Sequence, residues 1–276
     1  MKSESDLSKI AIKSLLYELN LQPRPWLLEP SDASSNSEQA IHQAIDKVYT
    51  LKPYFIKFVQ LGEYFDGDRL SELFESLRTL GKQAENVYLP ETNGVNPNQG
   101  ALFSLGILLT AAGYDQEHLQ ETVKKMLVDL DNEQPEELEE KTDLMPGEKL
   151  YLKYGIGGVR SEAIKGFPTA FDIALPFLKS RHNDNFERNL LDTLMDIVAE
   201  TDPKVMIMPD KVEELKNMQG YAKEILRVGG CNRTEGRQLL QEMNSYSNEN
   251  KLGLGFYKDI LIVTIFLYSL EIESNY

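Results

Sequence analysis

Two stretches of the sequence combine glycines with side chains suited to binding phosphate or moving a proton. The first, GVNPNQG at residues 94–100, places amide side chains between two glycines. The second, YGIGGVRSE at residues 154–162, leads from three glycines to Arg160 and Glu162. A guanidinium can hold a phosphate through two parallel N–H groups, and a carboxylate can bind magnesium or orient a hydroxyl. These residues are therefore candidates for a site that binds a phosphorylated ligand.

Structural roles compete with this interpretation. Asn96 can cap a helix, Pro97 suits its first position, and Gln99 can bond back to the cap. Such roles leave Gly94 and Gly100 unexplained, because glycine in a helix costs about 1 kcal/mol relative to alanine. A first turn without a side chain can receive an anion. The second stretch could equally be a loop with a local arginine–glutamate pair. Neither stretch matches a P-loop or a dinucleotide-binding fingerprint.

The composition narrows the class of protein. The chain has 276 residues, of which 41% are hydrophobic and 26% charged, as in ordinary globular proteins with a large core. A net charge of −15 argues against a surface for nucleic acid or anionic membranes. A single cysteine excludes an internal disulfide framework. The longest apolar run, residues 260–270, is shorter than the roughly 20 residues that span a bilayer. We expect a cytoplasmic protein that binds neither nucleic acid nor membranes.

The hydrophobic pattern predicts helices almost throughout. Leucine and isoleucine recur every three or four residues in the segments 6–19, 37–55, 68–81, 116–130 and 185–200. Residues 101–112 and 260–270 are apolar on all sides, which is typical of buried central helices. No internal repeat or long linker divides the chain. We therefore expect an all-α fold, a single domain over residues 1–276 with roughly ten or more helices.

Glycines and charged residues suggest where several helices end. Gly81 and Gly113 are predicted to terminate their helices, and the pair Gly229–Gly230 a later one. Asp259 directly precedes the last apolar run. The alternative to a catalytic role is that the negative charge of Asp259 stabilises the N-terminus of that helix.

Longer motifs resemble those of the triphosphoribosyl-dephospho-CoA synthases. They are GVNPNQGALFSLG, YGIGGVRSEAIKGFP, IALPFL, LKPYF and KDILIVTIFL, which follow the family's motif order over nearly the whole chain. This family transfers the triphosphoribosyl group of ATP to dephospho-CoA and releases adenine. Its product is the precursor of the prosthetic group on the carrier proteins of citrate lyase and malonate decarboxylase. The resemblance implies an all-α fold, ATP and dephospho-CoA as ligands, Mg²⁺, and a possible carrier-protein or synthase partner.

The resemblance also implies roles for individual residues. Glu162, Asp202 and Asp259 stand where catalytic carboxylates are expected, and Glu162 and Asp259 are the candidates for holding the metal. The candidates for binding the nucleotide are Arg24, Gly94, Asn96, Asn98, Gln99, Gly100 and Arg160. Displacing adenine from the ribose needs a carboxylate to take the hydroxyl proton or steady the developing cation, and cations to hold the triphosphate.

Several family positions are changed in this sequence. The family's His-Lys pair is Asn98–Gln99, and Asn36 replaces a motif histidine. Only Asp202 remains of an Asp-Thr-Asn motif. Because amides carry no charge and do not exchange protons near neutrality, they cannot replace histidine and lysine in acid–base work. Two alternatives to an active transferase therefore stay open. One is a catalytically degenerate relative that binds a nucleotide, a CoA derivative or a protein partner, and the other is an all-α interaction protein without a ligand.

Overall fold

The computed structural model describes residues 1–21, 38–88, 99–132, 151–152, 157–181, 185–203, 211–252 and 255–272. These residues form helices joined by short connections, and the described part contains no strand. The all-α prediction is therefore confirmed. None of the helices in these ranges combines the length and apolar character that crossing a membrane requires. The helices are α1 Glu4–Leu19, α2 Glu38–Thr50, α3 Lys52–Glu63, α4 Leu70–Tyr88, α5 Gln99–Tyr114, α6 Leu119–Met126, α7 Val128–Asn132, α10 Gly158–Ile164, the π-helix η2 Thr169–Ala174, α11 Leu175–Ser180, α12 Phe186–Glu200, α13 Val212–Arg227, α14 Thr234–Glu249 and α15 Gly255–Ile272.

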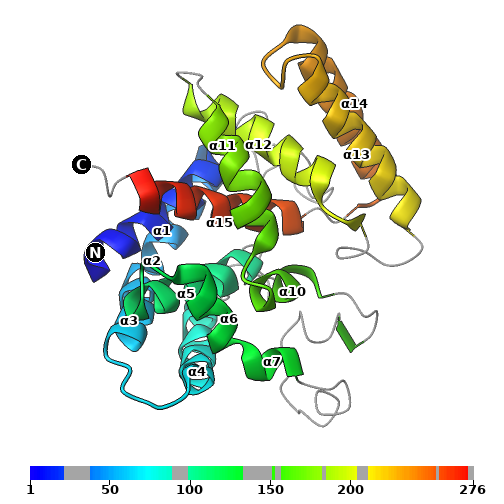
Figure 1. Ribbon diagram of the computed structural model, residues 1–276. Helices are drawn as coiled ribbons and strands as arrows, with labels where there is room; N and C mark the ends of the chain where they lie inside the picture. Colours follow the sequence, from blue (N-terminus) through cyan, green and yellow to red (C-terminus); the bar gives the residue numbers. More distant parts are fainter. Residues whose placement is uncertain are drawn as a thin grey trace.

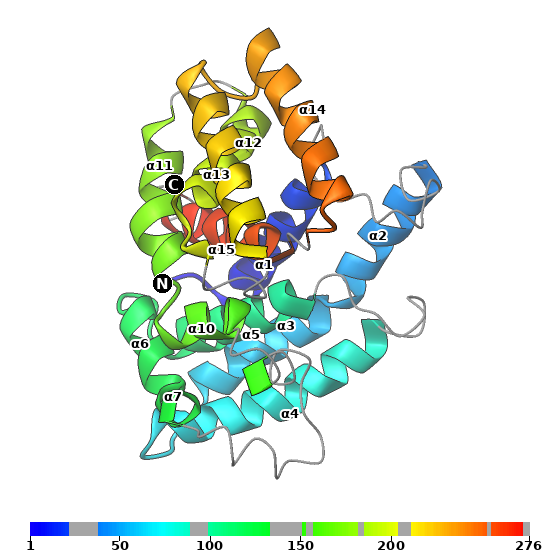
Figure 2. The ribbon, with the colours of Figure 1, turned by 90° about the vertical axis from the view of Figure 1, so that its right-hand side faces the viewer.

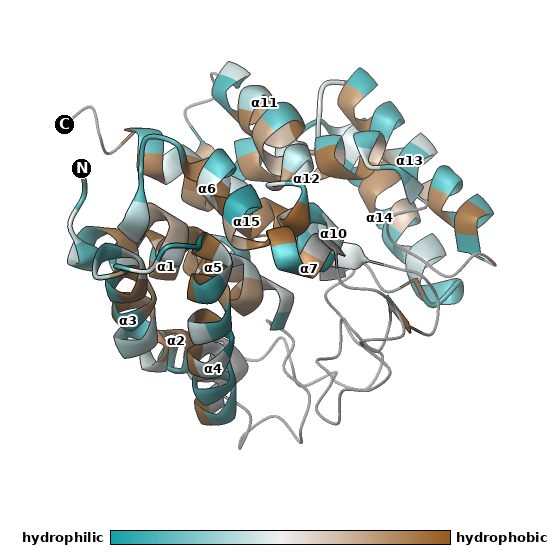
Figure 3. Cartoon of the chain, turned by 60° about the horizontal axis from the view of Figure 1, so that its bottom comes forward, coloured by the Kyte–Doolittle hydropathy of each residue, from teal (hydrophilic) through white to brown (hydrophobic). Residues whose placement is uncertain are grey.

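Helix α15 lies at the centre of the molecule. It packs against α1, α5, α10, η2, α11 and α12. Helices α3 to α6 lie on one side of it, and α11 to α14 lie on the other (Figure 1). Both α5 and α15 are buried along nearly their whole length, as their continuous apolar sequences predict. Apolar residues mostly face the inside of the assembly, and polar residues face outwards (Figure 3).

Helices α13 and α14 form an antiparallel pair that projects from the rest of the molecule. Two views at right angles show them side by side (Figure 2). Helix α13 packs on α12, whereas α14 packs chiefly on α13. The predicted end of α13 is confirmed, because Gly229 and Gly230 adopt positive φ angles of 102° and 92° directly after it.

The helix end predicted at Gly81 is wrong, whereas the end predicted at Gly113 lies within one residue of the observed end at Tyr114. Helix α4 continues past Gly81 to Tyr88, because the residues that follow are good helix formers and Ala84 is fully buried. Gly113 lies inside α5 and does not adopt a positive φ. Its role is close packing: a Cβ atom there would lie 2.1 Å from the backbone oxygen of Val59 in α3. Gly62 of α3 plays the reciprocal part, because a Cβ atom there would lie 2.0 Å from the backbone oxygen of Thr110 in α5.

The close approach of α3 and α5 gives a testable prediction. Gly113→Ala should destabilise the protein by about 1–3 kcal/mol, because the new methyl group meets rigid backbone and forces the two helices apart. Gly81→Ala is the matched control, since nothing lies within 4 Å of a Cβ at that helical position. It should stabilise by about 0.5–1 kcal/mol. Urea unfolding followed by circular dichroism measures both. Equal midpoints for the two variants would contradict this account of the packing.

Candidate functional site

The first turn of α5 and the carboxylate of Asp259 form the centre of the candidate site. Asp259 is 9% exposed, and its side chain lies against Gly100. A Cβ on Gly100 would lie 2.0 Å from Oδ2 of Asp259, so only glycine leaves room for this carboxylate. The backbone N–H of Ala101 donates a hydrogen bond to Asp259. Oδ1 has no hydrogen-bond partner among the described residues. One oxygen of this buried carboxylate is therefore left without a hydrogen bond.

This placement corrects the structural alternative for Asp259. Helix α15 begins at Gly255, so Asp259 lies beyond its first turn and does not serve its N-terminus. Its side chain instead reaches the N-terminus of α5, which comes from a distant part of the sequence. Gly100, left unexplained by helix capping, owes its identity to this contact.

Burial dominates the electrostatics of Asp259. It raises the pKa of the carboxyl from its ordinary value of 3.8 to about 7. The positive charge of Lys258 lowers the pKa, the negative charge of Glu18 raises it, and the Ala101 hydrogen bond lowers it. The partial positive charge of a helix N-terminus favours an ionised carboxylate by only about 0.3–2 kcal/mol. The cost of desolvating the ionised carboxylate exceeds that amount, so Asp259 is close to half-ionised at neutral pH.

Gln99 points to a different neighbour. Its amide donates a hydrogen bond to Oε1 of Glu85 on α4, at the edge of a cavity between α3, α4 and α5. Burial raises the pKa of Glu85, and the hydrogen bond from Gln99 lowers it. Gln99, the neutral residue at the motif position where the family has a lysine, is thus held by the carboxylate of Glu85. Its predicted contact with a nucleotide stays a prediction.

Arg160 and Glu162 lie on α10, a helix that adjoins the candidate site. Helix α10 packs against both α5 and α15, so the two glycine-containing stretches reach neighbouring helices. Both side chains are buried. Arg160 donates to the backbone oxygen of Leu130 at 3.0 Å and lies over the ring of Tyr151, 5.0 Å from its centroid. These contacts tie α10 to α7, a role that sequence reasoning did not assign to the arginine.

The carboxylate of Glu162 is engaged by the start of the π-helix. It accepts hydrogen bonds from the backbone N–H of Thr169 at 3.1 Å and from its Oγ1 at 2.7 Å. Burial raises the pKa of Glu162, and these hydrogen bonds lower it. The chain before Thr169 is strained, since Phe167 is fully buried with a φ of 54°. Glu162 therefore fixes a π-helical segment, a type of structure that is frequent at functional sites.

The other predicted residues are less informative. Asp202 is exposed just after the end of α12. Arg24, Gly94, Asn96 and Asn98 lie outside the described residues. The predicted helix start at Asn96–Pro97 lies outside them as well. The structure thus brings together Gly100 and Asp259. Gln99 precedes Gly100 at the start of α5, and Arg160 and Glu162 lie on α10.

The fit of a metal to these residues is uneven. Among the described residues, no three histidine, cysteine, aspartate or glutamate side chains are grouped closely enough to hold a metal ion. Asp259 has an open oxygen, which suits a hard cation. Glu162 would first have to release Thr169. Magnesium commonly uses one or two carboxylates together with substrate phosphates, so Asp259 fits such a site and Glu162 fits it less well.

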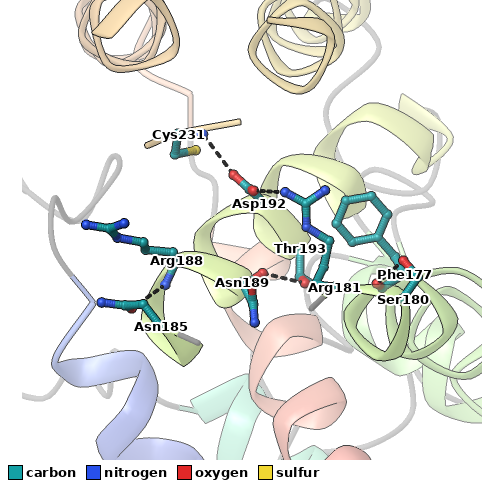
Figure 4. A network of polar contacts seen from close by, with 9 residues as sticks. All are labelled: Phe177, Ser180, Arg181, Asn185, Arg188, Asn189, Asp192, Thr193 and Cys231. Atoms are coloured by element: carbon teal, nitrogen blue, oxygen red, sulfur yellow. Dashed lines mark hydrogen bonds and ion pairs between the residues drawn. The ribbon is translucent and has the colours of Figure 1, made fainter. Parts of the chain in front are cut away.

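A second buried carboxylate, Asp192, belongs to a structural network. It forms an ion pair with Arg181 and accepts the backbone N–H of Cys231 at 2.8 Å (Figure 4). Arg181 also lies over the ring of Phe177. The network joins the end of α11, the middle of α12 and the α13–α14 connection. A Cβ on Gly230 would lie 2.4 Å from Asp192, which explains this glycine. Burial raises the pKa of the Cys231 thiol, so the thiol stays protonated at neutral pH.

Sequence reasoning missed Glu18. It is 4% exposed in the last turn of α1. The signal was present: Leu7, Ile10, Ala11, Ser14 and Leu15 define the buried stripe of this helix, and Glu18 follows at the same helical spacing. A charged residue on an apolar stripe needs a specific reason.

Comparison with known proteins gives a consistent result over the full length. Residues 4–276 match the CitG family model, described as ATP:dephospho-CoA triphosphoribosyl transferase. The chain belongs to this family. A probable 2-(5''-triphosphoribosyl)-3'-dephosphocoenzyme-A synthase of Lactiplantibacillus plantarum is 36% identical, over 93% of this chain and 94% of the relative. The corresponding protein of Streptococcus mutans is 29% identical, over 97% of both chains. Protein CitXG of Leuconostoc mesenteroides is 33% identical, over 96% of this chain and 59% of the relative. No solved structure matches.

Membership of the CitG family confirms the resemblance inferred from the motifs. The retained Gly100 and Asp259 of those motifs are the two residues that touch. The replaced residue Gln99 lies one position away and is bonded to Glu85.

The raised pKa of Asp259 predicts a pH-dependent effect on stability. The folded protein binds a proton here between about pH 4 and pH 7 that the unfolded chain releases, so this group's contribution to stability falls as the pH rises through that window. Asp259→Asn removes the buried charge. It should stabilise the fold at pH 8 by an amount on the order of a few kcal/mol. The difference should shrink at pH 5.

Urea unfolding at the two pH values measures this difference. Asp202→Asn is the control, because substitution of an exposed aspartate changes stability little at either pH. A destabilised Asp259→Asn variant at pH 8 would show that the ionised carboxylate is compensated in the fold.

Proposed function

We propose that this protein is an active transferase, which moves the triphosphoribosyl group of ATP onto dephospho-CoA with release of adenine. One observation carries the proposal: a buried carboxylate with an unpaired oxygen and a pKa of about 7 lies against the first turn of α5, a helix that begins in a family motif. Family membership over residues 4–276 supports the same reaction. The names of the relatives from Lactiplantibacillus plantarum and Streptococcus mutans support it too.

Asp259 supplies the base in this reaction. The bond between the ribose anomeric carbon and the adenine nitrogen breaks, and a hydroxyl oxygen of dephospho-CoA bonds to that carbon. The hydroxyl proton passes to Oδ1 of Asp259, and the departing adenine takes up a proton. A base works best when its pKa lies near the working pH, and the burial of Asp259 achieves this. Its negative charge also favours a developing oxocarbenium ion.

The first turn of α5 suits the phosphate side of the substrate. Its partial positive charge favours a negative group, and the carboxylate of Asp259 already lies against Gly100 in this turn and accepts the N–H of Ala101. Mg²⁺ would neutralise part of the triphosphate charge and be held mainly by the phosphate oxygens. Arg160 and Gln99 remain the candidate nucleotide contacts among the described residues, and Arg24, Gly94, Asn96 and Asn98 those outside them.

The proposed activity implies a place and a partner for the protein in the cell. The product would serve as the precursor of the citrate lyase prosthetic group, and the protein would act in the cytoplasm. A synthase or carrier protein that takes the product is the expected partner.

One observation favours the second candidate function, a degenerate relative that binds without catalysis. Gln99 is neutral and bonded to Glu85, and Arg160 and Glu162 are bonded within the fold. Gln99 therefore offers no positive charge to a triphosphate where the family has a lysine, and Arg160 is already bonded to Leu130. A test of turnover separates the two candidates.

Release of adenine is the direct test. Incubation with ATP, dephospho-CoA and Mg²⁺ should produce free adenine, followed by chromatography against an active synthase as positive control. Asp259→Asn should lower kcat/KM by about 10²–10⁴-fold, since it removes the base. Asp196→Asn is the matched control, because Asp196 is a half-buried aspartate of α12 whose pKa burial raises to about 6. It should keep near wild-type activity. No adenine from folded wild-type protein would favour the binding-only relative.

The contact between Gly100 and Asp259 can be tested separately. Gly100→Ala places a methyl group on the carboxylate and displaces it, which should lower kcat/KM by about 10²-fold. Gly106→Ala on the same helix is the control, since its Cβ would meet only ordinary contacts at 3.5 Å or more. Both variants are compared by adenine release after their folding is checked by circular dichroism. Full activity of Gly100→Ala would remove Asp259 from the reaction.

A further inference from the structure

A mostly apolar cavity lies between α3, α4 and α5. It is lined by three aromatic residues, Phe58, Phe74 and Phe103, and by the hydrogen-bonded pair of Glu85 and Gln99. Gln99 directly precedes Gly100, the residue that the Asp259 carboxylate contacts. The cavity therefore adjoins the first turn of α5, where the proposed reaction takes place.

Gly81 lines the same cavity and has no packing reason to be glycine. It lies inside α4, where glycine lowers the stability of the helix relative to alanine. Gly62, Gly100 and Gly113 each leave no room for a Cβ because another group lies too close. At Gly81, by contrast, no atom of the described residues lies within 4 Å of a Cβ position. The missing side chain thus keeps part of the cavity open over α4.

The other end of the cavity is filled by protein. A Cβ on Gly106 would meet the side chains of Leu77 and Phe58 at 3.5 Å and 3.6 Å, which are ordinary contact distances. The open part of the cavity therefore lies between Gly81 and the pair of Glu85 and Gln99.

Glu85 and Gln99 present a defined set of hydrogen-bonding groups at this open part. The amide nitrogen of Gln99 donates to Oε1 of Glu85, which fixes the direction of the glutamine side chain. The amide keeps a second N–H and an oxygen for a ligand. A glutamine amide pairs with adenine by accepting from the 6-amino group and donating to N7. The lysine that the family has at this position could not do this, because it only donates.

We propose that this cavity binds the adenine ring of a substrate nucleotide, with Gln99 contacting the 6-amino group and N7, Glu85 positioning Gln99, and Gly81 leaving room for the ring. Aromatic walls suit a flat heterocycle, since bases stack on aromatic side chains. The identity of the ligand rests on the proposed function, in which both ATP and dephospho-CoA carry an adenine ring. Adenine is bonded to the ribose carbon that reacts, so its site must adjoin the reaction centre, as Gln99 adjoins Gly100.

Nucleotide binding without turnover tests the space at Gly81. Isothermal titration calorimetry with ATP alone, and separately with dephospho-CoA alone, gives two Kd values. Gly81→Leu fills the open space and should raise the Kd of the nucleotide whose ring occupies it by about 10-fold or more. Leucine is a better helix former than glycine, so this variant is expected to fold.

Gly220→Leu is the matched control. Gly220 also lies inside a helix, with no described atom within 4 Å of its Cβ position, but it is exposed on α13 and does not line the cavity. This variant should leave both Kd values unchanged.

Selectivity at position 6 of the ring tests the role of Gln99. ITP carries an oxygen in place of the 6-amino group of ATP, so the amide oxygen of Gln99 would meet an acceptor. The wild-type protein should bind ATP about 10- to 100-fold more tightly than ITP, and Gln99→Leu should remove most of that preference. If Gly81→Leu shows that dephospho-CoA occupies the cavity, its inosine analogue replaces ITP in the comparison.

The site and the transferase function fail in different ways. Unchanged Kd values for both nucleotides in folded Gly81→Leu overturn the site, as does a Gln99→Leu variant that keeps the full preference for the 6-amino ring. If Gly81→Leu does not fold, the selectivity measurement decides. A protein that binds the adenine ring here but releases no adenine keeps the site and loses the transferase function. An enzyme that releases adenine while both variants bind as wild type keeps the function and loses the site.

Discussion

The contact between the Asp259 carboxylate and the first turn of α5 is the constraint on which the candidate site depends. It requires glycine at position 100, and it requires α5 and α15 to meet at a fixed distance. Both helices are almost entirely apolar, so hydrophobic burial holds them together and offsets the cost of placing a carboxyl group between them. Helices α1 and α10 pack against both of these helices. Asp259 stays a weak acid because the same core that positions it also desolvates it.

The polar residues near the site divide into those that support the fold and those that are open to a ligand. Arg160 and Glu162 bond to Leu130 and Thr169, and so fix α10 and the π-helix beside the centre. Asp259 has an oxygen with no partner among the described residues. A buried oxygen without a hydrogen bond lowers the stability of the fold, and such unfavourable groups are common at functional sites. The motif residues that surround Asp259 therefore act in part by holding its neighbours in place.

Much of the fold followed from the sequence. The three- and four-residue spacing of leucine and isoleucine placed the helices, and the continuous apolar segments identified α5 and α15 as central. Local rules failed where a glycine serves a tertiary contact. Gly81 and Gly113 look like helix ends in sequence, but Gly113 is required by the backbone of α3. Asp259 looked like a helix-capping charge because its partner, Gly100, lies far away in the chain. Glu18 was visible in the sequence only as a charged residue at the spacing of an apolar stripe.

The central position of α15 also bears on how the protein is made. Helix α1 ends at Leu19 and α15 begins at Gly255, yet the two pack along one another. A ribosome that has synthesised α1, α3 and α5 leaves their apolar faces without this partner until residue 272 has emerged. Contacts between such distant segments close slowly, because a long loop must lose entropy before they form. The nascent chain therefore exposes the surface that later becomes the site, and protection by chaperones during synthesis suits this architecture better than folding helix by helix.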